Sequence, residues 1–145
     1  MVKVEESVII NVPLEKVFVA GSDPETHLLW ETTTIKVEKL SQGSMGKGSK
    51  HRGSIRFLGQ IINWESVVAE FITDNRVEYA IAARSMRFRE KWHFEESEKN
   101  TRVTFIFEGN LQGLLRLITP IAVREWQKQA RKDLAEMKVV LESKN

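Results

Sequence analysis

The chain has 145 residues, of which 41% are hydrophobic and 29% are charged, and its 22 basic and 20 acidic side chains leave a formal net charge of +2. This composition is typical of one globular domain, spanning residues 1–145, and argues against disorder, while so small a net charge gives no indication of a nucleic-acid partner. The absence of cysteine excludes disulfides, thiolate metal sites and a cysteine nucleophile.

The first part of the chain predicts one strand followed by two short helices. Residues 2–12 carry valine and isoleucine at alternate positions, which is typical of a half-buried strand. A short helix is expected after Pro13, because proline is tolerated where a helix begins. A second helix is expected from Pro24, with Ser22 or Asp23 as its cap.

The segment GSMGKGSK at residues 43–50 follows a second predicted strand over residues 31–40. Its glycines and lysines suggest a phosphate-binding loop, but they have neither the Walker spacing nor the dinucleotide-binding spacing. A predicted strand follows the segment, so no helix N-terminus is available to hold a phosphate. We therefore predict a hairpin turn here.

The middle of the chain predicts further strands that alternate apolar and polar residues and are joined by short turns. Together with the strand before the glycine-rich segment they form an antiparallel meander of six strands. The five predicted strands are residues 49–58, 60–72, 76–83, 86–95 and 101–109.

The last part of the chain is predicted to be helical. Residues 111–118 form a short apolar turn, after which Thr119 is the expected cap and Pro120 the first helical residue. Apolar residues then recur every three or four positions almost to the end, which predicts an amphipathic helix of about 24 residues.

The predicted fold class is α+β. A sheet with one apolar face must be covered, and the C-terminal helix is the only predicted element long enough to cover it. We expect a curved seven-stranded antiparallel sheet wrapped around that helix, with two short helices between the first and second strands. The space between sheet and helix is the expected ligand site.

In this order of elements the chain resembles the START-like (SRPBCC) helix-grip proteins, and among them the polyketide cyclase/dehydratase branch. The resemblance spans essentially the whole chain. It implies a hydrophobic cavity for lipids, polyketides or other apolar molecules, and it does not imply catalysis, because many members only bind, carry or sense a ligand. The segments that carry it are SVIINVPLEKVF, DPETHLLWE, GSMGKGSKHR and DLAEMKVVLE.

Candidate ligand-binding residues follow from the inward parity of the predicted strands and from the apolar face of the C-terminal helix. They include all four tryptophans of the chain. The predicted set is Trp30, His51, Ile55, Phe57, Trp64, Tyr79, Ile81, Phe88, Glu90, Trp92, Phe105, Leu114, Ile118 and Trp126.

Three of these residues could act as a catalytic acid or base. Glu90 lies in the middle of an aromatic stripe, where desolvation would raise its pKa; the alternatives are a local bulge or an ion pair with Arg84 or Arg102. His51 is a candidate acid, base or hydrogen-bonding group, and the alternative is a structural histidine near a turn. Tyr79 could orient a polar ligand group or could simply pack in the core.

Other chemistry is not indicated by the sequence. The three histidines, His27, His51 and His93, are not spaced as a ligand set, so neither a metal nor another cofactor is expected. There is no GxSxG motif for a serine nucleophile. Basic residues on the outward parity of two strands are expected to form a solvated face of the sheet; they are Lys50, Arg52, Arg56, Arg87, Arg89 and Lys91.

The leading functional hypothesis is a non-enzymatic binding protein for a hydrophobic or amphipathic small molecule, such as a lipid, a polyketide-like compound or an aromatic compound. The alternatives are a cyclase/dehydratase-like lyase that uses Glu90, His51 or Tyr79, and a protein-interaction domain of the same fold that uses the outer sheet.

No apolar stretch approaches the ~20 residues of a membrane span, and acidic residues interrupt the first apolar run. The expected location is the cytoplasm, without a nucleic-acid partner, and a homodimer stays open.

Overall fold

The computed structural model describes residues 1–144 and contains seven strands and four helical segments in that range. The chain begins with β1 (Val2–Ile10), the helix α1 (Leu14–Gly21) and the 3-10 helix η1 (Pro24–Leu29). Six strands follow: β2 (Thr34–Lys39), β3 (Lys50–Phe57), β4 (Gln60–Ile72), β5 (Arg76–Ala83), β6 (Met86–Ser97) and β7 (Asn100–Leu111). The 3-10 helix η2 (Gly113–Ile118) and the long helix α2 (Thr119–Ser143) complete the fold.

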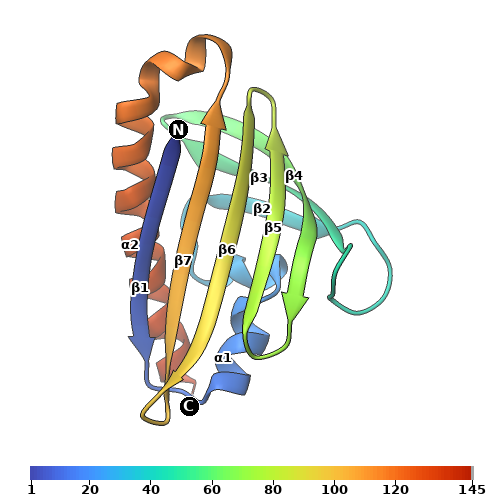
Figure 1. Ribbon diagram of the computed structural model, residues 1–145, viewed down its shortest axis with the longest axis vertical. Helices are drawn as coiled ribbons and strands as arrows, with labels where there is room; N and C mark the ends of the chain where they lie inside the picture. Colours follow the sequence, from blue (N-terminus) through green and yellow to red (C-terminus); the bar gives the residue numbers. More distant parts are fainter. Residues whose placement is uncertain (145) are drawn as a thin grey trace.

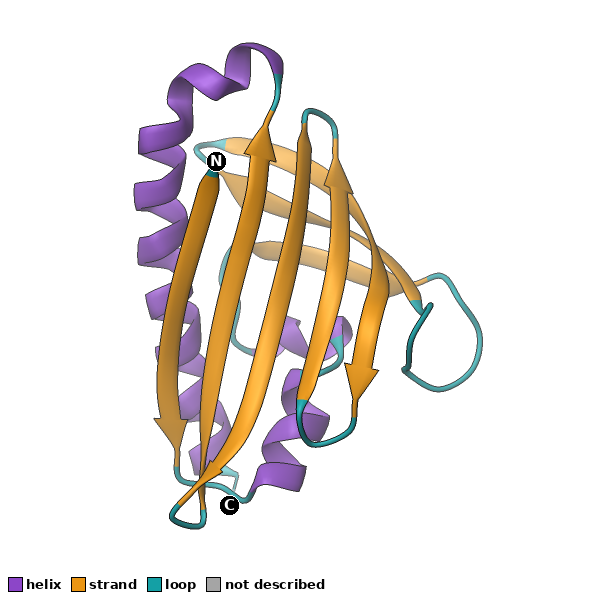
Figure 2. Ribbon diagram, in the orientation of Figure 1, coloured by secondary structure: helices purple, strands orange, loops and turns teal. Residues whose placement is uncertain are grey.

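The strands form one antiparallel sheet in the order β1-β7-β6-β5-β4-β3-β2, which confirms the predicted meander. The first strand pairs with the last, β7, and so extends the meander at its far edge. The sheet is strongly bent, so that β2 and β3 cross behind the longer strands, and α2 runs along the side of β1 (Figures 1 and 2). The predicted helix-grip architecture is therefore confirmed.

The glycine-rich segment connects two antiparallel strands, β2 and β3, as predicted. Gly43 and Gly48 have φ angles of 87° and 90°, which a residue without a side chain adopts at little cost. The Gly48 amide donates to the Val68 carbonyl at 2.9 Å and ties the connection to β4. The segment is a hairpin connection, and no helix begins after it.

Two apolar clusters fill the interior, and both contain residues of α2. The helix contributes a stripe at three- and four-residue spacing, of which Ala130, Leu134 and Met137 are buried. One cluster packs this stripe against α1, β1, β5, β6 and β7, and the other packs it against Phe88 and the start of β1. The sequence pattern of the C-terminal helix thus determines which of its faces meets the sheet.

Some predicted boundaries differ from the structure. The second strand was expected to begin at residue 31 but begins at Thr34, and the Trp30 amide donates to the His27 carbonyl at 3.2 Å and closes the last turn of η1. Asp23 caps η1 as predicted, since its Oδ1 accepts from the Glu25 amide at 2.9 Å. The prediction that Thr119 caps the last helix is wrong, because its hydroxyl donates back to the Arg116 carbonyl at 2.8 Å.

The outward basic residues are largely paired within the sheet. Lys91 lies 2.8 Å from Glu108 and Arg52 lies 2.9 Å from Glu38. The guanidinium of Arg87 donates to backbone carbonyls. These contacts agree with a solvated outer face.

Among the described residues, no helix combines the length and the hydropathy that a bilayer crossing needs.

Candidate functional site

A cavity of about 230 Å³ lies between the sheet and α2. Its lining comes from η1, from α2 and from every strand except β1. Typical ligand pockets have volumes of roughly 300–1,000 Å³, so the cavity is somewhat smaller than this range and suits a compact ligand. Its position between the bent sheet and the helix is the one expected from the sequence.

One end of the cavity is aromatic. Trp126 of α2 stacks on Phe57 with ring centroids 4.6 Å apart, and Phe88 stacks on Phe107 at 4.4 Å. Edge contacts of Trp126 with both phenylalanines of the second pair join the four rings into one wall. This wall offers a planar apolar ligand offset stacking and edge contacts.

The other end contains ionisable groups, and Glu90 projects into it. The strand register is unbroken around this residue, which lies opposite Tyr79 on β5 and Phe107 on β7, so the alternative of a bulge is wrong. The alternative of an arginine partner is also wrong, because Glu90 makes no ion pair with any of residues 1–144. Arg102 instead lies 4.0 Å from Glu95. The carboxyl of Glu90 therefore faces the cavity.

Two carboxyl groups of this polar end hold a proton more strongly than usual. Burial raises the pKa of Glu90 to about 7, with the Glu31 carboxylate adding to the shift and His27 opposing it. The nearby indole N–H of Trp92 also lowers the pKa of Glu90. This N–H does not meet the geometry of a full hydrogen bond to any acceptor in the described residues. Burial and then the charge of Glu31 raise the pKa of Asp133 to about 7. Both groups exchange protons near neutral pH.

His27 supplies the positive charge of the polar end. Its Nε2–H donates to the Gly21 carbonyl at 2.9 Å, and its Nδ1 lies 3.5 Å from the Glu31 carboxylate. Burial by itself lowers the pKa of His27, but the charge and hydrogen bonding of Glu31, with Glu90 and the Gly21 carbonyl, raise it to about 9. The imidazolium is therefore the neutral-pH form.

Two hydroxyl groups complete the lining of this region. Tyr79 donates to the Ser22 carbonyl at 2.5 Å, and burial raises its pKa well above the ordinary value. Its hydroxyl thus anchors the start of η1. The Ser66 hydroxyl is buried and has no hydrogen-bond partner among residues 1–144, although the side chain lines the cavity. An unpaired buried hydroxyl is available to a ligand.

Nine of the fourteen predicted ligand-binding residues line the cavity, namely Ile55, Phe57, Trp64, Tyr79, Ile81, Phe88, Glu90, Phe105 and Trp126.

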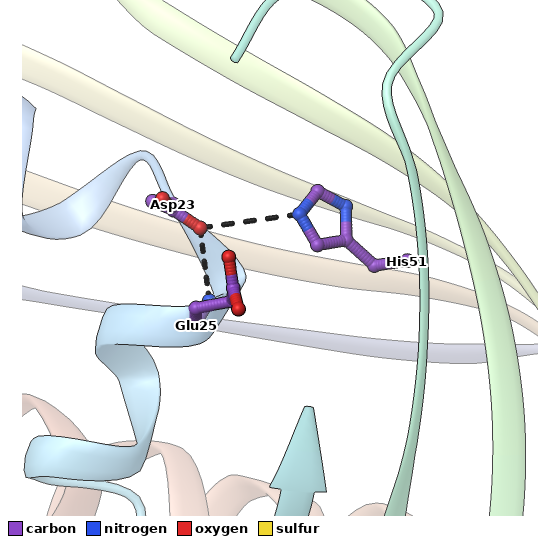
Figure 3. A group of neighbouring side chains, drawn as sticks. All are labelled: Asp23, Glu25 and His51. Carbon is purple, nitrogen blue, oxygen red and sulfur yellow. Dashed lines mark hydrogen bonds and ion pairs between the residues drawn. The ribbon is translucent and has the colours of Figure 1, made fainter. Parts of the chain in front are cut away.

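Five predicted ligand-binding residues lie elsewhere. Trp30 and Trp92 are buried in the core, where both contact the His27 ring. Leu114 is 85% exposed on η2, and Ile118 packs against the second apolar cluster. His51 is fully buried and is not part of the cavity lining; its ring faces the start of η1 (Figure 3). Burial lowers the pKa of His51, the charge of Asp23 opposes this shift, and the charge of Lys39 adds to it.

The prediction missed most of the polar lining. His27, Glu31, Gln129 and Asp133 all border the cavity, and none was in the predicted set. The last two lie on the helical face of Trp126 at three- and four-residue spacing, a signal that could have identified them. No comparable pattern identifies His27 and Glu31, because their position depends on how η1 folds back over the sheet.

Comparison with known proteins agrees with this architecture. The chain matches the model of the family described as polyketide cyclase / dehydrase and lipid transport over residues 1–142, while no curated protein matches it. TTHA0849 from Thermus thermophilus has a TM-score of 0.84 at 18% identity, with 99% of both chains covered. The Zhui aromatase/cyclase from Streptomyces sp. R1128 has a TM-score of 0.75 at 18% identity, covering 97% of this chain and 93% of that one. Ara h 8.0201 has a TM-score of 0.74 at 14% identity, with 97% of each chain covered.

At these identities the solved structures establish a shared fold. The family model extends over nearly the whole sequence. The chain therefore belongs to the polyketide cyclase / dehydrase and lipid transport family.

Proposed function

We propose that the chain binds an apolar or amphipathic small molecule, such as a lipid, a polyketide-like compound or an aromatic compound, in the cavity between the sheet and α2. The observation that carries this proposal is the two-ended lining of the cavity, with two stacked aromatic pairs in edge contact at one end and ionisable groups at the other. A ligand with an apolar body and one polar group would match both ends. The family description supports the same ligand class.

The polar end favours ligands that exchange hydrogen bonds with a protonated carboxyl group. Glu90 makes no hydrogen bond of good geometry in residues 1–144, and the Ser66 hydroxyl, which also lines the cavity, is unpaired. A ligand hydroxyl or carbonyl would pair with the carboxyl of Glu90, and a ligand oxygen would also satisfy the buried hydroxyl of Ser66. We infer that the ligand places an oxygen at this end and its apolar part against Trp126.

A matched pair of substitutions tests this proposal. Ala83 lines the cavity, whereas Ala82 is exposed on the opposite face of β5. Ala83→Phe should narrow the cavity and weaken the binding of 2-naphthol at least tenfold by calorimetry, while Ala82→Phe should leave the affinity unchanged. Native mass spectrometry of the purified wild type should show a co-purifying apolar molecule. Absence of any co-purifying molecule, together with no saturable binding of 2-naphthol or a medium-chain alcohol, would count decisively against the proposal.

A second candidate function is acid–base catalysis of a cyclase or dehydratase type. It is favoured by the position of Glu90, whose pKa of about 7 matches a neutral-pH acid or base, beside an imidazolium at His27. Two other candidates are less suited, because the Tyr79 hydroxyl already donates to the Ser22 carbonyl and His51 lies outside the cavity lining. We propose Glu90 as the proton-transferring group if the chain is an enzyme.

The Glu90→Gln variant tests this second function, because glutamine keeps the shape and hydrogen bonding of the side chain but cannot transfer a proton. With a reactive poly-β-carbonyl compound as substrate, ring formation can be followed by ultraviolet absorption. The variant should lose turnover and keep its affinity within a few-fold. Equal turnover by the variant and the wild type would remove Glu90 from consideration.

A further inference from the structure

His51 is a fully buried histidine whose ring has no hydrogen-bond partner in the described residues. Its side chain is fully buried in β3, and neither Nδ1 nor Nε2 has a hydrogen-bond partner within residues 1–144. Leaving a buried polar group unpaired costs free energy, so most such groups in proteins have a partner. The imidazole therefore has two nitrogens that are available to bind a ligand.

The ring points at two carboxylates that come from a distant part of the chain (Figure 3). His51 Nε2 lies 3.9 Å from Asp23 Oδ1. The donor atoms of Asp23, Glu25 and His51 all lie within 4.8 Å of one another. The histidine and the carboxylates belong to separate elements, β3 and the start of η1, so only the tertiary fold brings the three groups together.

The backbone that carries the carboxylates is held firmly in place. The Glu25 amide donates to Asp23 Oδ1 at 2.9 Å, and the Thr26 hydroxyl donates to the Asp23 carbonyl at 2.6 Å. One residue earlier, the Ser22 carbonyl accepts the 2.5 Å hydrogen bond from Tyr79 of β5. The start of η1 is thus fastened both to itself and to the sheet, which holds the Asp23 carboxylate opposite His51 before any ligand binds.

We propose that Asp23, Glu25 and His51 bind a divalent transition-metal ion, with Zn²⁺ as the best match. One imidazole nitrogen and two carboxylate oxygens are ligands that Zn²⁺ accepts, and three protein ligands with an open position are a common arrangement for it. Bond lengths of about 2.0–2.2 Å place neighbouring ligand atoms roughly 3.4 Å apart. Rotation of the exposed Glu25 side chain and of the Asp23 carboxylate, with the backbone unchanged, would shorten the present separations to this value.

This site is separate from the cavity, although it adjoins the cavity wall. Pro24, which lies between the two carboxylates in the chain, lines the cavity, and so does Ser66, the cross-strand neighbour of His51. The expectation of no metal site rested on the spacing of the three histidines. It did not consider carboxylates that the fold brings to one of them.

Titration of the untagged, EDTA-treated and dialysed protein with ZnCl₂ tests the site by calorimetry. We expect one ion per chain and no saturable binding of Mg²⁺. His51→Gln and Glu25→Gln should each weaken Zn²⁺ binding at least about tenfold. Asp23→Asn should do the same while keeping the helix cap, because asparagine caps as well as aspartate. His93→Gln, which changes a histidine elsewhere, should leave the affinity unchanged.

A second measurement uses Co²⁺ as a spectroscopic substitute for Zn²⁺. Bound Co²⁺ of low coordination number gives intense visible absorption, which should disappear in His51→Gln and persist in His93→Gln. If the variant at the buried His51 does not fold, Glu25→Gln, at an exposed position, decides the question. Equal Zn²⁺ affinity in the wild type and in a folded Glu25→Gln or His51→Gln variant, or no binding by the wild type, would overturn the proposal.

Discussion

The buried His27 and the partly buried Glu31 form an ion pair at the polar end of the cavity, with Nδ1 of the imidazole 3.5 Å from the carboxylate. The two residues are four positions apart at the end of η1, and the His27 ring contacts the rings of both Trp30 and Trp92. Two further carboxyls, Glu90 and Asp133, lie near enough to change their pKa values in response to this pair. The charge state of the cavity therefore depends on His27.

The first prediction concerns this ion pair. His27→Gln should lower the free energy of unfolding at pH 7 by about 2–4 kcal/mol, because it leaves buried carboxylates without their cation. Urea denaturation measures the change. Glu5→Gln, on the outward face of β1, should change the stability by less than about 0.5 kcal/mol. A His27 variant as stable as the Glu5 variant would show that the carboxyls simply take up protons.

The second prediction concerns pH. The folded-state pKa of Glu90 is raised from about 4.5 to about 7, so its contribution to stability is fully present below pH 4.5 and is lost as the pH rises through 7. The wild type should lose on the order of 2 kcal/mol more stability than Glu90→Gln between about pH 4.5 and pH 8. Urea denaturation at both pH values gives the difference. Glu65→Gln, on the exposed face of β4, should lose as much stability as the wild type. An equal loss of stability in the wild type and in Glu90→Gln would contradict the raised pKa of Glu90.

The third prediction concerns the anchor of η1. Tyr79→Phe removes the hydroxyl that donates to the Ser22 carbonyl and leaves that carbonyl unpaired in the interior. The free energy of unfolding should fall by roughly 1–2 kcal/mol. Because the same bond positions the carboxylates of the proposed metal site, Zn²⁺ affinity should fall as well. An unchanged denaturation midpoint would show that another donor replaces the hydroxyl.

The fourth prediction uses the tryptophans as reporters of the cavity. Trp64 and Trp126 line it, whereas Trp30 and Trp92 are buried in the core. Binding of 2-naphthol should change the tryptophan fluorescence, and Trp126→Phe should remove much of that change. Trp30→Phe should retain it. A response that disappears with Trp30 and survives without Trp126 would place the ligand elsewhere.

The fifth prediction concerns a glycine that permits close packing of β6 and β7. A Cβ at Gly109 would lie 2.2 Å from the Arg87 carbonyl oxygen and 2.5 Å from the Phe88 ring. Gly109→Ala should lower the free energy of unfolding by roughly 2–3 kcal/mol, measured in urea. A Cβ at Gly46 meets nothing within 4 Å, so Gly46→Ala should have little effect. Equal stability of the two variants would contradict the packing argument.

Much of the cavity wall could be predicted from local patterns. Alternation along β6 identifies Glu90 as inward-facing, and helical spacing identifies Trp126, because an unbroken register or helix fixes the direction of every side chain once one face is buried. The same reasoning fails for Leu114, which lies on a short 3-10 helix with no buried residues.

The amino-acid sequence by itself determined the order of the elements, the antiparallel meander and the inward face of each long strand, because these depend on residue spacing within one element. Only the tertiary structure decided that η1 brings His27 to Glu90 and Asp23 to His51. Those meetings depend on the bend of the sheet and on the path of the connecting chain, which are set by packing between residues far apart in sequence.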